Sequence, residues 1–75
     1  MRKICVRVDW EETEEGEMMP LVIRWDDGRV FPVDRVSYVC VSPDGEYDGI
    51  RYTVLIGKRE RYLYRDGNRW YVQGL

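Results

Sequence analysis

The stretch "IRYTVLIGKRERYLYRDGNRWYV", residues 50–72, decides the fold of this chain. It contains six Arg or Lys, four Tyr and one Trp, and glycines at positions 57 and 67 divide it into three runs. Runs rich in Tyr, Val, Ile and Thr that are bounded by Gly and Asp are typical of β-strands joined by hairpins. Aromatic and basic residues together are also typical of surfaces that bind single-stranded nucleic acid. The stretch is therefore either two hairpins of a small sheet or a nucleic-acid platform.

Side-chain parity separates these two interpretations, because alternate residues of a strand point to opposite faces. We assign three-residue connections at 57–59 and 65–67, which set Val54 against Tyr62 and Tyr62 against Trp70. The predicted buried face holds Ile50, Tyr52, Val54, Ile56, Tyr62, Tyr64, Trp70 and Val72, and the predicted outer face holds Arg51, Thr53, Leu55, Arg61, Leu63, Arg65, Arg69 and Tyr71. Rings then point inward and guanidinium groups outward, which favours the hairpins over the nucleic-acid platform.

A two-residue turn at Gly57 and Lys58 is the alternative for the first connection. It would bring Arg61 opposite Val54 on the buried face. We reject this register because a charged side chain in an apolar environment is costly.

Two further turns have the same chemistry as "RDG" at 65–67, namely "DDG" at 26–28 and "PDG" at 43–45. Each suits a three-residue hairpin loop whose last residue needs a positive φ, which Gly adopts without a steric penalty. With a loop at 26–28, large apolar residues meet on one face, and the paired positions are Trp25 with Arg29, Ile23 with Phe31, and Leu21 with Val33.

The recurring short strands predict an all-β fold in a single domain of residues 1–75. We expect an antiparallel meander of about five to six strands, because a chain this short has room for one small core. Such a sheet twists and protects its edges by curling, so we predict a small, partly open SH3-like barrel. Pro32 cannot donate to a ladder, so residues 30–34 should lie at an edge or bulge. An open edge there could accept a strand from a partner.

The segments "RWDDGRVFPVDRV" and "GIRYTVLIGKRERYLY", with "RWYV" after them, carry a resemblance. Around them the chain resembles a group of small uncharacterised bacterial all-β proteins of unknown function. The likeness covers residues 20–72. It implies a compact β fold and transfers no functional residue.

Charge is segregated along the chain, although the formal net charge is only −2. Residues 9–17 carry six acids and no base, whereas residues 51–75 carry six bases and two acids. We expect residues 10–19 to form one long acidic loop, which mutual repulsion keeps extended. It is either a solvated loop, a docking surface for a basic partner or for the protein's own Arg face, or a loose divalent-cation site.

Several function classes receive little support from the sequence. The chain has no His and few hydroxyl side chains, so the usual pair of nucleophile and base is missing, and we expect no enzyme. Cys5 and Cys40 have no zinc-ligand spacing and are expected to be reduced, so neither metal nor cofactor is predicted. No apolar run reaches the roughly 20 residues that span a bilayer. We therefore expect a cytoplasmic protein without a membrane partner.

The candidate binding residues are the outer-face residues Arg51, Arg61, Arg65, Arg69 and Tyr71, together with Trp10 beside the acidic segment. Ten of the 12 basic residues are Arg, which favours fork-type recognition. Trp10 either closes the core or serves as an exposed contact anchor. We expect the partner to be another protein, bound through a strand edge or the Arg-rich face. The alternative is an accessory domain that contacts nucleic-acid phosphates through the same arginines.

Overall fold

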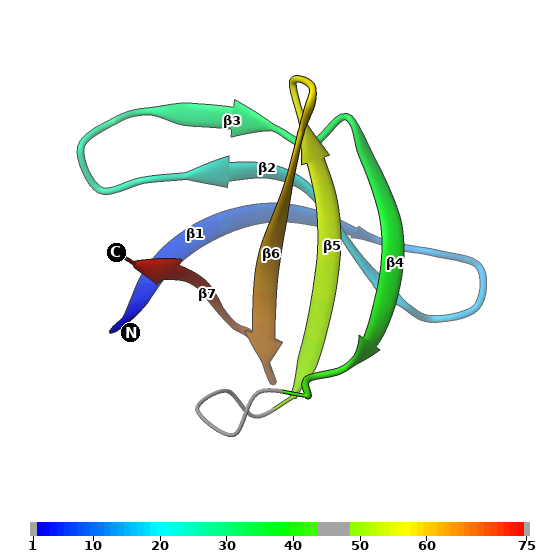
Figure 1. The fold of residues 1–75 in the computed structure, drawn as a ribbon. Coiled ribbons are helices and arrows are strands. Elements are labelled where there is room, and N and C mark those ends of the chain that lie inside the picture. Colours follow the sequence, from blue (N-terminus) through cyan, green and yellow to red (C-terminus); the bar gives the residue numbers. More distant parts are fainter. Residues whose placement is uncertain (1, 44–48, 75) are drawn as a thin grey trace.

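A computed structural model describes residues 2–43 and 49–74 of the 75-residue chain. It contains seven strands, which are β1 (Arg2–Glu12), β2 (Met18–Arg24), β3 (Val30–Pro32), β4 (Arg35–Val41), β5 (Ile50–Ile56), β6 (Arg59–Asp66) and β7 (Arg69–Gly74). All strand pairs are antiparallel, and the described residues contain no helix (Figure 1). The all-β class is confirmed. The strands number seven instead of the five or six expected.

The sheet is a half-barrel made of two meanders, because its strand order is β3-β2-β1-β7-β6-β5-β4. The single meander that we predicted is wrong in this respect, since the first strand pairs with the last. The N-terminal part of β1 pairs with β7 and its C-terminal part pairs with β2. This long strand curves, so the β2–β3 end of the sheet turns toward β4–β6 (Figure 1).

A sharp corner connects the two ends of the sheet. The Val33 N–H donates to the Leu21 carbonyl (2.8 Å), and the next N–H, that of Asp34, donates to the Leu55 carbonyl (2.8 Å). The chain thus leaves the ladder of β2 and joins that of β5 within two residues. The edge predicted at residues 30–34 is present as β3, but the half-barrel opens along β4.

The β2–β3 hairpin has the register that the sequence predicts. Ile23 pairs with Phe31, and the Trp25 N–H donates to the Arg29 carbonyl (3.0 Å) around a loop at 26–28. Gly28 has φ +91°, as the last residue of such a loop requires. The Trp25 and Phe31 rings meet edge to face, with centroids 6.4 Å apart. Matching apolar partners therefore selected one loop length here.

The register predicted for β6 is wrong. The pairs Ile56 with Arg59 and Asp66 with Arg69 leave two-residue loops at 57–58 and 67–68. Gly57 and Gly67 both have φ +62°, and no other loop residue in these hairpins has a positive φ. This is the pattern of type II′ turns, whose twist matches that of the flanking strands.

In the observed register every side chain of β6 lies on the opposite face of the sheet from the one predicted. Leu63 lies opposite Tyr52 and Val72 on the inner face, whereas Tyr62 and Tyr64 lie on the outer face. Leu63 is completely buried, and Tyr62 is 45% exposed. Tyr64 is only 1% exposed although it lies on the outer face. The faces predicted for β5 and β7 are retained.

The core lies between the two ends of the half-barrel. Its buried members come from five strands and are Val6, Ile23, Tyr52, Val54, Leu63 and Trp70. The Tyr52 and Trp70 rings pack with centroids 5.4 Å apart. Burying each large apolar side chain contributes roughly 1.5–3 kcal/mol, so the fold depends on this one cluster.

The interval predicted as an acidic loop, residues 10–19, is half strand. β1 continues to Glu12 and β2 begins at Met18, so the connection is a short hairpin turn. Thr13 closes this turn, because its Oγ1 accepts a bond from the Glu17 N–H (3.1 Å) and its carbonyl accepts one from the Gly16 N–H (2.9 Å). Repulsion does not unfold the segment, since the carboxylates stay in water while the backbone pairs.

The loop predicted at residues 43–45 falls partly outside the described residues. The described neighbours show that the Ser42 N–H donates to the Gly49 carbonyl (2.9 Å). Pairing between β4 and β5 therefore continues beyond Val41 as far as this point.

Candidate binding site at the open edge

Strand β4 is an edge strand that pairs with β5 on one side only, and it carries exposed apolar side chains. It ends the strand order on one side, and β5 is its only neighbour among the described residues. Tyr38 is 62% exposed, Val39 37% and Val41 76%. The run Val36–Ser42 carries no charge, although charged residues usually protect natural edge strands, and its pairing with β5 is regular from Tyr38 to Val41, beyond a register shift between Val36 and Tyr38. Such an edge is suited to pairing with another strand.

The backbone of β4 directs free hydrogen-bonding groups away from the sheet. Ser42 bonds to β5 through its N–H, and residues two apart in an antiparallel ladder bond to the same neighbour. Cys40 and Tyr38 therefore also direct their backbone groups toward β5. Val39 and Val41 direct theirs to the side where the described sheet has no strand.

A half-open pocket of about 290 Å³ lies on the inner side of this edge. It occupies the barrel opening, the gap between β4 and the beginning of β2. Its lining residues come from the β1–β2 turn and from β2, β4, β5 and β6, and are Gly16, Glu17, Met18, Val39, Ile50, Tyr52 and Arg65. Most of the lining is apolar, so the pocket suits an aliphatic group.

A short hydrogen-bond chain forms one wall of the pocket. The Tyr52 hydroxyl donates to the Met18 carbonyl (2.8 Å) across the barrel opening. Arg65 Nε donates to that hydroxyl (3.0 Å), and Arg65 Nη1 donates to the Gly67 carbonyl (2.6 Å). Because the guanidinium group is held at two points, the pocket has a defined shape on this side.

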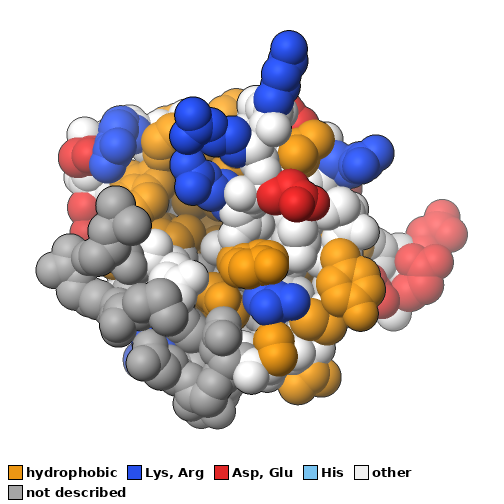
Figure 2. All heavy atoms as spheres, viewed as in Figure 1, with side chains coloured by type: hydrophobic (Ala, Val, Ile, Leu, Met, Phe, Trp, Pro, Cys, Tyr) orange, Lys and Arg blue, Asp and Glu red, His pale blue; other side chains and the backbone are white. Residues whose placement is uncertain are grey.

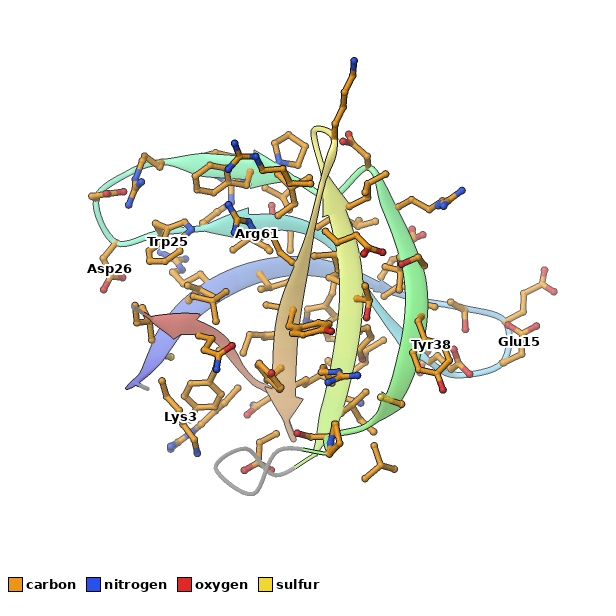
Figure 3. All side chains as sticks on the ribbon, in the orientation of Figure 1. Lys3, Glu15, Trp25, Asp26, Tyr38 and Arg61 are labelled. Carbon is orange, nitrogen blue, oxygen red and sulfur yellow. The ribbon has the colours of Figure 1, made fainter. Side chains whose placement is uncertain are left out.

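The other side of the pocket is acidic. The acidic hairpin, residues 11–18, carries five exposed glutamates, which are Glu11, Glu12, Glu14, Glu15 and Glu17. Among the described residues the salt bridges involve Asp9 and Asp27, and none involves these five. Glu15 projects beyond β4 at the tip of the hairpin (Figure 3). The hairpin therefore borders the open edge and does not cover the Arg-bearing outer face.

The predicted arginine cluster is divided between the two faces of the sheet. Arg51, Arg69 and Tyr71 lie on the outer face, as predicted. Arg61 and Arg65 lie on the inner face, because the type II′ turns reverse the parity of β6. Arg61 is exposed all the same (Figure 3). The five residues do not form one site.

Trp10 lies outside the core. It is 45% exposed and pairs with the buried Pro20 just after a register shift between Asp9 and Trp10. Leu21 is the extra residue at this shift, because Asp9 pairs with Val22. Of the two roles considered for Trp10, closing the core does not fit this exposure, and the contact-anchor role stays a prediction.

The outer face brings aromatic and basic groups together, contrary to the parity argument. The Arg51 guanidinium carbon lies 4.3 Å from the Tyr62 ring centroid, and Lys3 Nζ lies 5.3 Å from that of Tyr71. Figure 2 shows hydrophobic side chains around a basic group over β4–β6, and Figure 3 places Tyr38 on the same side. Arg51 Nε is buried and has no hydrogen-bond acceptor among the described residues.

The sequence reasoning missed Tyr38, Val39 and Val41. The signal was the run "VSYVCVSP", residues 36–43, which has no charged residue although charged residues make up 35% of the chain. A solvent-facing strand with its other side in the core should alternate apolar and polar residues. The run lacks the charged residues expected on the solvent-facing side of such a strand, and this was the available signal.

Two ion pairs lie away from this site. Arg24 pairs with Asp9 (2.9 Å) and Arg29 with Asp27 (2.7 Å). The side-chain hydrogen bond from Arg24 lowers the pKa of Asp9, and the same bond raises the pKa of Arg24. The backbone N–H of Arg29, which donates to Asp27 (3.0 Å), is the main cause that lowers the pKa of Asp27. These pairs occupy two of the arginines that could otherwise meet a ligand.

Comparisons and searches for other kinds of site add the following. No protein-family model matches the chain, and no curated protein and no solved structure matches it either. Residues 2–43 and 49–74 contain no group of three or more His, Cys, Asp or Glu placed to hold a metal ion. The same part of the chain has no helix long and apolar enough to span a membrane.

Proposed function

We propose that the protein is a non-enzymatic binding module that takes up an extended segment of another protein as an additional strand on β4. The observation that carries this proposal is the uncharged, unpaired edge of β4, with Tyr38, Val39 and Val41 exposed. Strand addition uses the free backbone groups of an edge for affinity and neighbouring pockets for specificity. Both components are present here, since the pocket lies directly beside Val39.

An SH3-like relationship and a cytoplasmic location are further parts of this proposal. The proposed SH3-like relationship concerns the small barrel fold alone, because SH3 domains bind polyproline II peptides in aromatic-lined grooves, a mode distinct from strand addition. Cys5 and Cys40 are free and lie on β1 and β4, four strand positions apart. Two free thiols are compatible with a reducing compartment.

Substituting Val41→Pro tests the edge directly. The Val41 N–H points away from β5, so proline removes no bond of the β4–β5 ladder, and we expect unfolding free energy to change by less than about 1 kcal/mol. It removes a donor to any added strand and places a ring in its path. Peptides selected from a random phage-displayed library on the wild-type protein should therefore bind the variant at least about tenfold more weakly.

Val41→Thr is the matched control, because it keeps the N–H and a β-branched shape. Selected peptides should bind this control within about twofold of wild type. Strand addition at β4 is wrong if the selected peptides bind Val41→Pro as tightly as they bind the wild-type protein.

Nucleic-acid binding through the outer face is the second candidate. It is favoured by the exposed Tyr62 ring beside Arg51, whose buried Nε lacks an acceptor among the described residues. Bases stack on such rings, and phosphates pair with such cations. A fluorescent oligothymidine titrated at two salt concentrations decides the matter, since log K should fall with log salt by about 0.7 per phosphate contact. Absence of binding at low salt removes this candidate.

A further inference from the structure

We propose that the segment added to β4 has an aliphatic residue opposite Val39 and Lys or Arg residues beside the acidic hairpin. This inference rests on the strand addition proposed above and names the chemistry of the partner. It follows from two features that border the same edge, an apolar pocket and a row of unpaired carboxylates.

Parity places one side chain of the added strand in the pocket. Val39 pairs with the buried Tyr52, so its side chain points to the inner face. A residue directly opposite Val39 on an added strand points to that same face. There it meets Met18 and Ile50, which line the pocket with Val39.

The pocket has room for a side chain of the added strand. Its volume of about 290 Å³ is close to the lower end of the range of roughly 300–1,000 Å³ that is typical of small-molecule sites, and it is half-open. Val41 lies on the same face as Val39, because it pairs with Ile50, and it extends the apolar surface along the edge.

The charge beside the pocket selects for a basic segment. Glu17 lines the pocket, and the other four glutamates of the acidic hairpin are exposed without an ion pair among the described residues. Arg65 is on the opposite wall and is already bonded to Tyr52 and Gly67. Cations of the added segment would therefore be attracted to the hairpin side, an attraction that salt screens.

A second copy of this chain fits the edge less well. If two β4 strands paired about a two-fold axis, the inner faces of both copies would lie on the same side of the joined sheet. The two acidic hairpins would then border one interface, with five exposed glutamates from each copy. Like charges brought together at an interface oppose association.

Two synthetic peptides test the inference, Ac-Lys-Lys-Thr-Val-Thr-Lys-Lys-amide and the same peptide with Glu in place of each Lys. Binding to the full chain is measured by isothermal titration calorimetry at about 20 mM and 150 mM salt, where screening differs strongly. At low salt the Lys peptide should bind at least about tenfold more tightly than the Glu peptide. Replacing its Val by Asp should weaken binding by a similar factor, because a charge would enter the apolar pocket.

The double variant Glu15→Lys/Glu17→Lys should strongly weaken the charge preference, because it takes the hairpin from five negative charges to a net charge of −1. Both residues are exposed in the turn, and the Glu17 bond to Thr13 uses the backbone N–H, so the fold should persist, which circular dichroism checks. Equal affinity for the two peptides, or an unchanged preference in the double variant, overturns the inference.

The outcomes separate this inference from the proposed function. If Val41→Pro abolishes peptide binding but binding shows no preference for Lys over Glu or for Val over Asp, the inference alone is overturned. Binding that Val41→Pro leaves intact overturns both. A dimer in sedimentation that Val41→Pro converts to a monomer would show that a second copy occupies the edge, which also overturns the basic-segment inference.

Discussion

Leu63→Ala is expected to lower the free energy of unfolding by about 3 kcal/mol, within the 2–5 kcal/mol usual for truncating a buried Leu. Leu63 is fully buried between Tyr52 and Val72, so the substitution leaves a cavity in the single core. A 75-residue domain has a total stability of roughly 4–11 kcal/mol, so the loss is a large fraction. Chemical denaturation with an unchanged m-value measures it.

Tyr62→Ala is the matched control for Leu63→Ala. Tyr62 is next in sequence but lies on the outer face, and its truncation should cost less than about 1 kcal/mol. The three-residue loop at 57–59 would give the opposite order, with Tyr62 inside and Leu63 outside. A larger loss for Tyr62→Ala would therefore contradict the type II′ register.

Gly49→Ala is expected to destabilise the protein by about 3 kcal/mol or more. Gly49 has φ +91°, a conformation that costs an L-residue roughly 1–2 kcal/mol. A Cβ at this position would also overlap the carbonyl oxygen of Arg65, which is backbone and cannot rotate away. Displacing packed backbone typically adds about 1–3 kcal/mol. Thermal unfolding followed by circular dichroism should show a clear decrease in Tm.

Gly28→Ala separates the two contributions. Gly28 has the same φ of +91°, but a Cβ there meets no atom within 4 Å. Only the conformational cost of roughly 1–2 kcal/mol remains. Equal losses for the two glycine variants would show that Gly49 does not pack against β6 in the way described.

The sequence determines some registers and leaves others open, for a physical reason. At the β2–β3 hairpin only one loop length brings Ile23 and Phe31 together on an apolar face. In β6 the large apolar residues do not alternate with polar ones, since Tyr62, Leu63 and Tyr64 are consecutive. Either parity then buries large side chains, and the turn geometry decides. The Gly-X pairs at 57–58 and 67–68, read as type II′ turns, were the signal to follow.

The burial argument that excluded the correct register treated the whole inner face of the sheet as covered. A charged residue opposite Val54 is costly only if the inner face is covered along its whole length. In the half-barrel, Arg61 reaches solvent at one end, and Arg65 is satisfied by the Tyr52 hydroxyl and the Gly67 carbonyl at the other. The partly open shape could be predicted, but which strand stays open could not, because that depends on the corner at Val33 and Asp34.

Amide hydrogen exchange along β4 tests the central claim most directly. The N–H groups of Val39 and Val41 point off the sheet and should exchange rapidly in the free protein, whereas that of Cys40, which bonds to β5, should be protected. Saturation with the Lys-flanked peptide should slow exchange at Val39 and Val41 and leave Cys40 unchanged. Rapid exchange at both valines in the saturated complex would contradict strand addition at this edge.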